Sequence, residues 1–384
     1  MPSAARTLRR VPASADLVAL GRSHGLDAVG VTAAEPFATT RRHLERRRSA
    51  GLHGGMQFTY RRPERSADPT RALPDARALV VAARSYRRTP PPADPTPGDG
   101  APRPQGRVAR YAWLDHYAEL RAGLTAIKEA LTGEGWRARV LADDNALVDR
   151  EAAYRAGLGW YGKNANLLLP GRGSWFVLGS VLTDAPLRPT GGPVEDGCGT
   201  CTRCLSGCPT GAIVAPGVVD ARRCLAWLLQ VDGPFPREHR VALGDRLYGC
   251  DDCQEVCPPN RRADRAAPAP AAPGAEAVVD LLDLLAATDD ELLARHGRWY
   301  VPRRQARYLR RNALVVLGNV ADGADPRVAA ALRRCLAWPD PLVRAHAAWA
   351  ARRLGRDDLV AEAGLETDDD PLVRAELAAP VERR

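Results

Sequence analysis

Apolar residues in the first half of the chain follow two alternating patterns. Residues 76–83 form an unbroken apolar run, which is typical of a strand covered on both faces. Residues 119–135 place apolar side chains at helical spacing, which predicts an amphipathic helix that stops near Gly133. This alternation of helix and strand predicts an α/β domain over residues 1–190. Shorter strands are predicted at 27–32, 138–143 and 174–184.

Capping residues and proline-rich segments set the expected boundaries of the elements. Asp16 is the predicted cap of a first helix that ends at Gly25. Residues 89–106 are rich in proline, and we expect a loop that excludes both helix and inner strand. A second stretch of proline and alanine, at 262–277, marks a domain boundary.

The pattern after this boundary is purely helical. Asp325, Asp340 and Asp370 are each followed by proline, and this pair predicts a helix start: aspartate caps the helix and proline takes its first position, where no amide donor is needed. The spacing of these starts resembles a short stack of HEAT-type helical pairs. We therefore expect a HEAT-like helical repeat domain over residues 275–384, with a binding role.

Eight of the nine cysteines lie between residues 198 and 257. The run CGTCTRCLSGCP has the spacing of two-cluster ferredoxins, in which three close thiolates hold one cluster and the fourth reaches the other. This predicts a ferredoxin-like domain with two 4Fe-4S clusters over residues 191–265. The expected ligands are Cys198, Cys201, Cys204 and Cys257 for one cluster, and Cys208, Cys224, Cys250 and Cys253 for the other.

Other interpretations of the cysteines are weaker. A disulfide framework suits a small secreted domain, and this chain is long and has no export signal. Zinc stays open as an alternative, because paired CxxC units are its usual ligands. Cys335 stands apart in an apolar helical stretch and is expected to be a buried structural thiol.

Composition narrows the class of protein. The net charge is +9, and two clusters with their thiolates would bring about four negative charges, which still leaves a basic protein. A basic excess indicates a polyanionic partner, and a merely solvated surface stays open as the alternative. No run reaches the roughly 18 apolar residues of a membrane span. Arg9 and Arg10 lack the apolar region of an export signal, so we expect a cytoplasmic protein.

Two segments of the first domain could carry chemistry. Asp143, Asp144 and Asn145 follow the strand 138–142, at the end where ligands of α/β sheets gather, although a solvated turn is the alternative. Residues 156–169 combine glycines with Lys163, but they match neither a phosphate loop nor a dinucleotide fingerprint.

Several strings, taken together and in order, give the chain a family resemblance. DREAAYRAGLGWYGKNANLLL, GSWFVLGSVLTDAPL, CGTCTRCLSGCPTGAIV, LYGCDDCQEVCPPN and RRNALVVLGN resemble the epoxyqueuosine reductase family. The resemblance implies a cytoplasmic enzyme with cobalamin and two 4Fe-4S clusters, which reduces epoxyqueuosine to queuosine at the wobble position of tRNA. In this family a corrinoid-binding α/β domain precedes a ferredoxin-like domain and a helical-repeat tail.

The resemblance also implies roles for individual residues. Cob(I)alamin is the expected nucleophile, the clusters relay electrons, and Asp143 is the expected proton donor, with Asp144 as a rival because the local sequence departs from the family motif. The implied cobalamin contacts are Arg65, Ala109, Asp143, Lys163, Leu167, Leu178, Ala226, Cys250 and Asp251.

Partners follow from the same resemblance. The tRNA contacts expected are Gln230, Arg261, Arg304 and Arg307; residues 301–311 interleave arginine with Tyr308, which suits phosphate contact and base stacking, and a solvated basic helix is the alternative. A low-potential donor such as ferredoxin or flavodoxin would supply electrons, and we expect a monomer.

Three other functions stay open on the sequence alone. A corrinoid iron–sulfur reductase of a small molecule, like the reductive dehalogenases, would use the same cofactors. A ferredoxin-like electron carrier would leave residues 1–190 without a purpose. An RNA-binding scaffold would carry zinc in place of iron.

Overall fold

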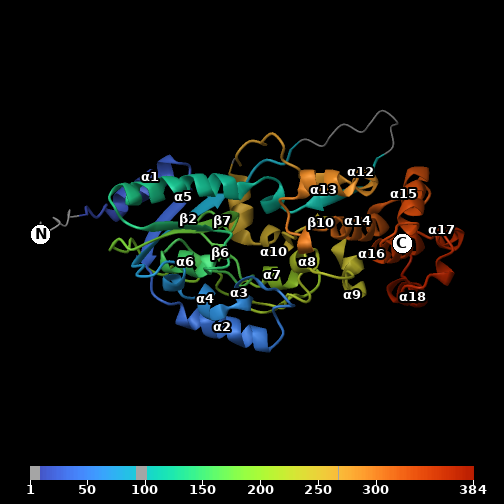
Figure 1. Cartoon of the computed structure of the whole chain (residues 1–384), viewed down its shortest axis with the longest axis horizontal. Helices are drawn as coiled ribbons and strands as arrows, with labels where there is room; N and C mark the ends of the chain where they lie inside the picture. Colours follow the sequence, from blue (N-terminus) through green and yellow to red (C-terminus); the bar gives the residue numbers. More distant parts are fainter. Residues whose placement is uncertain (1–8, 92–101, 267) are drawn as a thin grey trace, which may run out of the picture.

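The computed structural model describes residues 9–91, 102–266 and 268–384. Figure 1 shows an elongated molecule, with a sheet and its covering helices at the N-terminal end and a stack of helices at the C-terminal end. The cysteine-rich segment lies between these two parts. Residues 92–101, the greater part of the predicted proline-rich loop at 89–106, lie outside the described residues.

A four-stranded sheet forms the centre of the N-terminal part. Its order is β1-β2-β7-β4, and all neighbouring strands are antiparallel. In an antiparallel sheet the carboxyl ends of neighbouring strands lie at opposite edges. The argument from parallel sheets that placed a ligand at Asp143–Asn145 was therefore wrong for this sheet. The strands are β1 (Ala28–Ala33), β2 (Ala78–Ser85), β4 (Ala138–Ala142) and β7 (Phe176–Thr183).

Both faces of this sheet are covered, as the apolar run at 76–83 predicted. Alternate residues of β2 enter two different apolar clusters: Val80 packs toward α5 (His116–Gly133), and Val81 packs toward α6 (Asp149–Arg155). The predicted apolar stripe of α5 is fully buried. The remaining helices of this part are α1 (Ser14–Ser23), α2 (Ala38–Ser49), α3 (Phe58–Arg61) and α4 (Pro63–Ser66).

The predicted cap of the first helix was wrong by three residues. Helix α1 begins at Ser14 with Ala13 as its cap residue, and Asp16 lies within the first turn. A carboxylate in the first turn still interacts favourably with the helix dipole, so Asp16 suits either place. The predicted end holds, because Gly25 follows the helix with a left-handed φ of 82°.

The cysteine-rich segment is built from short elements. Its strand β10 (Arg246–Tyr248) pairs with β3 (Gln105–Val108), which also pairs with β11 (Val278–Asp280). Its other elements are α7 (Arg203–Ser206), β8 (Ile213–Ala215), β9 (Val218–Val219), α8 (Leu225–Leu228), α9 (Arg237–Leu243), α10 (Asp252–Glu255) and α11 (Pro258–Arg265). Strands β5 (Trp160–Tyr161) and β6 (Leu167–Leu168) pair with each other and precede this segment.

Strand β3 corrects the prediction for residues 89–106. Gln105 and Gly106 belong to the middle strand of a three-stranded sheet, not to a loop. Gly106 permits this because the strand lies close to its neighbours: a Cβ there would come within 2.7 Å of the Leu247 Cβ atom. The segment has no proline after Pro104, so its amides are free to pair.

The C-terminal part is helical, as predicted. Asp325, Asp340 and Asp370 each accept a hydrogen bond from the backbone amide two residues ahead, which confirms the three predicted caps. The helices are α12 (Leu281–Ala286), α13 (Asp289–His296), α14 (Arg307–Val320), α15 (Pro326–Leu336), α16 (Pro341–Arg353), α17 (Asp357–Glu362) and α18 (Pro371–Ala378).

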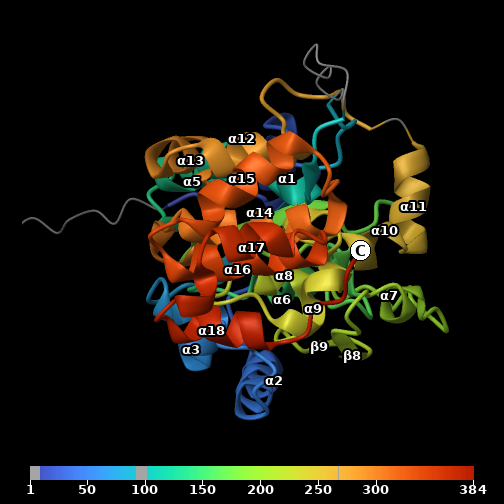
Figure 2. The ribbon, with the colours of Figure 1, turned by 90° about the vertical axis from the view of Figure 1, so that its right-hand side faces the viewer.

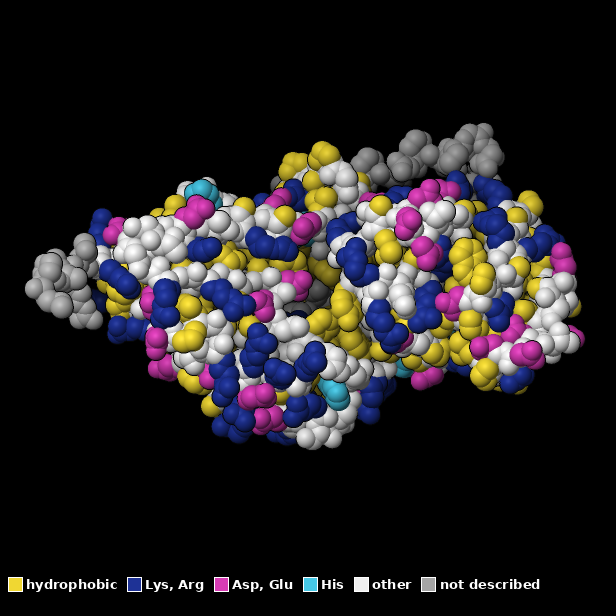
Figure 3. All heavy atoms as spheres, viewed as in Figure 1, with side chains coloured by type: hydrophobic (Ala, Val, Ile, Leu, Met, Phe, Trp, Pro, Cys, Tyr) yellow, Lys and Arg dark blue, Asp and Glu magenta, His cyan; other side chains and the backbone are white. Residues whose placement is uncertain are grey.

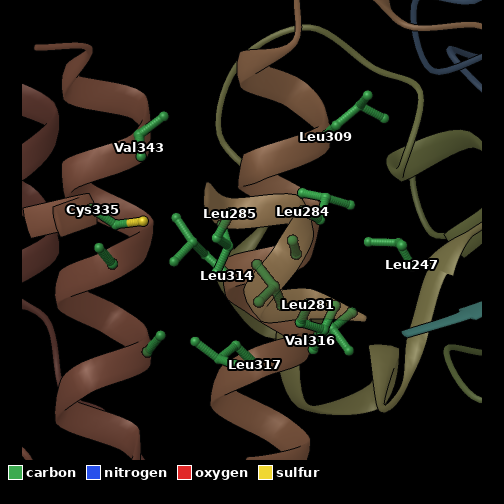
Figure 4. Close-up of a cluster of buried hydrophobic side chains, with 14 of the residues drawn as sticks. Leu247, Leu281, Leu284, Leu285, Leu309, Leu314, Val316, Leu317, Cys335 and Val343 are labelled. Atoms are coloured by element: carbon green, nitrogen blue, oxygen red, sulfur yellow. The ribbon is translucent and has the colours of Figure 1, made fainter. Parts of the chain in front are cut away.

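One large apolar core joins the C-terminal helices to the cysteine-rich segment. Leu247 of β10 belongs to the same buried cluster as Leu314 of α14 and Val343 of α16. Figure 4 shows Cys335 among these apolar side chains, and its thiol is fully buried, as expected of a structural cysteine. Among the described residues, no helix is both long and apolar enough to cross a membrane.

A buried arginine fastens α14 to the chain that follows α8. The Arg311 side chain is fully buried, and its guanidinium donates to the carbonyl oxygens of Leu228, Leu229, Val231 and Gly233 at 2.7–3.1 Å. Together with the Asn312 amide, which donates to the Leu229 carbonyl at 3.0 Å, Arg311 fixes the position of residues 228–233 beside the helices.

We expect Arg311→Met to destabilise the protein by about 3 kcal/mol or more, because a buried carbonyl left without a donor costs roughly 1–3 kcal/mol. The measurement is the thermal unfolding midpoint, and Arg334→Met, at an exposed position of α15, is the matched control. Equal midpoints for the two variants would show that Arg311 does not hold this segment.

Candidate functional site

The loop after β4 presents a carboxylate with no partner. Asp143 is exposed and has a left-handed backbone conformation, with φ of 55°. Ala142, the residue before Asp143, pairs with Gly179 in the first half of β7, next to Leu178. None of the described residues hydrogen-bonds or ion-pairs with the Asp143 carboxylate, so it is free to meet a ligand.

The neighbouring Asp144 is engaged by the protein itself. Its carboxylate accepts a hydrogen bond from the Ala146 amide at 2.8 Å and pairs with the Arg139 guanidinium at 3.1 Å. These contacts stabilise the turn. The geometry therefore favours Asp143 over Asp144 as the reactive carboxyl.

A third carboxyl lies close to Asp143. The Oδ1 atom of Asp149, in the first turn of α6, is buried without a hydrogen-bond partner. Burial raises the pKa of Asp149 well above its usual range, and the charges of Asp143 and Asp144 raise it further, against the opposing charge of Arg150. Burial also raises the pKa of Tyr117, and Asp143 and Asp149 add to that effect, so these three side chains share one environment.

Ala109 and Arg110, at the start of a short 3₁₀ helix (Arg110–Ala112), contact the second cysteine run. The Ala109 amide donates to the Tyr248 carbonyl at 2.9 Å, and the Arg110 amide donates to Asp251 Oδ2 at 2.6 Å. Burial raises the pKa of Asp251 to about 6, although the Arg110 amide opposes the shift. Ala109, Cys250 and Asp251, three of the expected cobalamin contacts, therefore lie near one another.

Glycine makes this approach possible. Gly249 has φ of 73°, and a Cβ there would lie 2.5 Å from the Ala109 Cβ atom. Any larger residue would push the cysteine loop away from Ala109. The Gln230 amide donates to the Tyr111 hydroxyl at 3.3 Å and to the Ala226 carbonyl at 3.0 Å, which places Gln230 and Ala226 in the same neighbourhood. We name Ala109, Ala226, Gln230, Cys250 and Asp251 the wall of the site.

An arginine-lined cavity adjoins the Asp143 loop. Its volume is about 230 Å³, and its lining comes from α3, α4 and the loop, with Phe58, Arg61, Arg62, Arg65, Ser66 and Asn145. The Ser66 hydroxyl donates to the Asn145 carbonyl at 2.6 Å, which ties α4 to the loop. Figure 3 shows Lys and Arg side chains gathered over this region, next to a hollow.

The remaining predicted cobalamin contacts lie around this centre at different depths. Leu178 is partly exposed and packs with the buried Leu167 in the apolar cluster behind the loop. Lys163 lies instead at the first cysteine run, where its ammonium donates to the Gly199 carbonyl at 2.6 Å. Lys163 thus holds the cysteine loop.

The eight clustered thiols fall into two groups of four. Burial raises the pKa of Cys257 to about 11, and Cys198, Cys204 and Cys201 add to the shift; we name these four the outer thiol group. Burial also raises the pKa of Cys253, and the nearby thiols of Cys250, Cys224 and Cys208 raise it further. We name these four cysteines the inner thiol group. The inner thiol group lies beside Asp251.

The arrangement of the thiols suits clusters. Among the described residues, no three His, Cys, Asp or Glu side chains converge on a point that one metal ion could occupy. Each thiol group has four members, the number of thiolates that a four-iron cluster binds. The Ala212 amide donates to Cys208 Sγ at 3.2 Å, the kind of bond that tunes a cluster.

The residues expected to touch tRNA are divided between two places. Arg307 pairs with Asp340 at 3.4 Å and lies over the Tyr308 ring, while Arg304 donates to the Gly297 carbonyl at 3.1 Å. Gln230 lies at the wall described above. Arg261 lies elsewhere, on α11, and shares no contact with the other three.

Comparisons with known proteins agree with this geometry. The family model described as "4Fe-4S double cluster binding domain" matches residues 197–260. Epoxyqueuosine reductase of Bacillus subtilis (strain 168) is 33% identical over 375 residues, which cover 96% of this chain and 95% of the relative. This chain belongs to the epoxyqueuosine reductase family.

Other members of the epoxyqueuosine reductase family extend the match. The relative from Xanthomonas campestris pv. campestris is 35% identical, over 89% of this chain and 96% of its own. An epoxyqueuosine reductase solved with a tRNA-Tyr epoxyqueuosine-modified stem loop superposes with a TM-score of 0.82, 31% identity and coverage of 94% of this chain and 96% of that one. The full-length match favours this family over the dehalogenase-like alternative.

A further solved structure bears on the Asp143 loop. It is the Bacillus subtilis epoxyqueuosine reductase with its catalytic aspartate loop swung out of the active site, at a TM-score of 0.81, 31% identity and coverage of 94% of this chain and 96% of that one. In that relative, a catalytic loop that carries an aspartate lies outside the active site.

Asp149 is the member of this epoxyqueuosine reductase site that sequence reasoning missed. An acidic residue in the first turn of a helix is common, because it complements the helix dipole, so nothing in the sequence set Asp149 apart. Only the tertiary structure shows its buried oxygen and its closeness to Asp143.

We expect Asp149→Asn to stabilise the protein at high pH. Folding raises the pKa of Asp149, so the native state holds this proton more tightly than the unfolded chain, and native stability falls as pH rises above the unfolded pKa. Thermal unfolding of both proteins from pH 5.5 to 8.5 should show an advantage for Asn that grows with pH, toward about 1 kcal/mol, the usual scale for a buried unpaired group. An advantage independent of pH would contradict this assignment.

Proposed function

We propose that this protein reduces epoxyqueuosine to queuosine at the wobble position of tRNA. The observation that carries the proposal is the Asp143 carboxyl, which has no partner among the described residues. Burial raises the pKa of Tyr248 and the charge of Asp143 adds to that shift, so Asp143 lies near Tyr248, whose carbonyl accepts the Ala109 amide. The solved relative with an epoxyqueuosine-modified stem loop supports this choice of substrate.

The reaction needs two electrons and two protons, because the epoxide oxygen leaves as water and an alkene remains. Asp143 would deliver a proton to the departing oxygen, a role that typically contributes 10²- to 10⁴-fold, on the order of magnitude seen for general acids. Asp149 would keep a second proton nearby, because its environment favours the neutral carboxyl. Asp144, held by Arg139 and the turn, would position the loop.

The residues at this site fit cobalamin. The wall is largely apolar and closely packed at Gly249, so a flat ring could lie against it, and the cavity of Arg61, Arg62 and Arg65 would suit the phosphate of the cofactor. Ala109, Leu178, Ala226, Cys250 and Asp251 would line the ring, with Leu167 and Lys163 as supports behind it. Cobalamin, when bound, would supply the low-valent cobalt nucleophile that attacks the epoxide.

We propose that each thiol group holds one 4Fe-4S cluster. The outer thiol group would bind the cluster of Cys198, Cys201, Cys204 and Cys257, and the inner thiol group would bind the cluster of Cys208, Cys224, Cys250 and Cys253. Since the inner thiol group lies beside Asp251 and Ala109, its cluster would deliver electrons to the reaction centre one at a time.

The same proposal covers the domains and partners. We propose an α/β domain at 1–190, a ferredoxin-like domain at 191–265 and a HEAT-like domain at 275–384, acting as a monomer in the cytoplasm. Gln230, Arg304 and Arg307 would hold the tRNA stem loop over the site. Gln230 lies next to Ala226, and Arg307 donates to the Tyr308 hydroxyl, which in turn contacts Asp232, two residues after Gln230. An external donor of low potential would supply the electrons.

Asp143→Asn should lower turnover by about 100-fold or more, because the amide cannot give up a proton to the leaving oxygen. The assay is anaerobic incubation of the reconstituted protein with cobalamin, dithionite and tRNA bearing epoxyqueuosine, followed by mass analysis of the nucleosides for the loss of one oxygen. Asp144→Asn is the control: its side-chain oxygen can still accept the Ala146 amide that holds the turn, so turnover should stay within a few-fold of the parent. Full activity of the Asp143 variant would remove it from the reaction.

Cys253→Ser should remove only the inner cluster. Iron analysis after reconstitution should fall from roughly eight to roughly four atoms per chain, since each cluster holds four irons. Cys335→Ala, at the buried cysteine of α15, should retain all the iron. Loss of only one iron equivalent, or a zinc-only protein, would refute the cluster assignment.

A further inference from the structure

A second arginine-lined cavity lies on α7 and α11. Its volume is about 330 Å³, and it is lined by Pro258 together with four exposed arginines, which we name the arginine face: Arg203, Arg261, Arg262 and Arg265. In the part of the chain that the structure describes, none of these four guanidinium groups has a carboxylate partner. A concentrated and uncompensated positive charge therefore faces solvent here.

The structure of α11 explains why this charge is uncompensated. The single acidic residue of the helix, Asp264, turns inward and pairs with Arg110 at 3.0 Å. Asn260 and Ala263 are buried on that same inner side. The outer side of the helix is left with Arg261, Arg262 and Arg265, so the positive surface belongs to the way the helix docks.

The arginine face lies directly over the outer thiol group. Arg203 precedes Cys204 in the chain, and α11 starts immediately after Cys257, whose carbonyl accepts the Arg261 amide at 2.9 Å. The inner thiol group lies beside Asp251, which accepts the Arg110 amide. Figure 2 shows α7 and α11 on one side of the molecule and α3, which borders the Asp143 cavity, on the opposite side.

We infer that the arginine face is the docking surface for a small acidic protein that carries one electron at a time. This inference rests on the proposed function, which needs two electrons for each turnover. Each encounter would oxidise the carrier by one electron and reduce the outer cluster by one electron. The carrier leaves after each transfer, and a small interface dominated by opposite charges suits such brief encounters.

A nucleic acid could also bind arginines, and Arg261 was expected from the sequence to contact tRNA. Two observations favour the carrier protein: the arginine face borders the outer thiol group, and it lies on the side away from α3 and the Asp143 cavity. A stem loop whose modified base reaches Asp143 has no need of this surface. RNA binding here is therefore an outcome that the experiment must separate.

The test is the rate of cluster reduction in the reconstituted full chain. Reduced flavodoxin, a small acidic protein, is mixed anaerobically with the parent and with the double variant Arg262→Glu/Arg265→Glu, and bleaching of the iron–sulfur absorbance is followed in a stopped-flow instrument. At low ionic strength we expect about a tenfold or greater loss of rate, because charge steering changes association rates by about 10- to 10³-fold. Added salt should slow the parent and bring the two rates together.

The matched control is Arg22→Glu/Lys128→Glu, which makes the same charge change at exposed positions of α1 and α5. It should keep the parent rate. Reduction by dithionite should be unchanged in both variants, and so should the affinity for tRNA. Because this readout needs neither cobalamin nor substrate, failure of the proposed function would appear separately, as absent turnover with dithionite.

Three results would overturn the inference. The first is equal reduction rates of the parent and the Arg262→Glu/Arg265→Glu variant by flavodoxin at low salt. The second is an equal loss of rate in the control variant, which would mean that net charge alone matters. The third is a loss of tRNA affinity in the Arg262→Glu/Arg265→Glu variant without a loss of reduction rate, which would make the arginine face an RNA surface.

Discussion

A buried amide network holds the cysteine-rich segment against the sheet, and the site depends on it. Asn260 is fully buried; its oxygen accepts the Ser174 amide at 2.6 Å, and its nitrogen donates to the Gln254 carbonyl at 2.8 Å. Gly173 permits this approach, because a Cβ there would lie 2.0 Å from the Asn260 oxygen. Unpaired buried amides are costly, so the network specifies one position for the segment between Cys253 and Cys257.

Three carboxyls within seven residues differ through their surroundings. Asp144 pairs with Arg139 and accepts the Ala146 amide in a turn. Asp149 has a buried Oδ1 atom without a hydrogen-bond partner, and Asp143 contacts no partner among the described residues. The same functional group thus stabilises a turn at Asp144, favours the neutral form at Asp149, and stays open to a ligand at Asp143. In a protein that must provide protons beside a developing negative charge, such division is the expected means of separating structural from reactive acids.

Charge is also divided between opposite sides of the molecule. The cavity of Arg61, Arg62 and Arg65 borders the Asp143 loop, whereas the arginine face borders the outer thiol group. A net charge of +9 only indicated a polyanionic or acidic partner. Separate positive surfaces would allow an RNA and an electron carrier to be engaged at once, with the clusters between them.

The sequence alone determined the features that depend on near neighbours. The CxxCxxCxxxCP spacing, the Asp-Pro caps at Asp325, Asp340 and Asp370, and the apolar run of β2 each follow from contacts within a few residues, which local chemistry dictates. The tertiary structure decided the antiparallel order of the sheet, the inner position of β3, and the different fates of Asp143, Asp144 and Asp149. These depend on groups such as Leu247, Arg139 and Tyr117 that approach only after folding, because burial and pairing are properties of the assembled neighbourhood rather than of the residue.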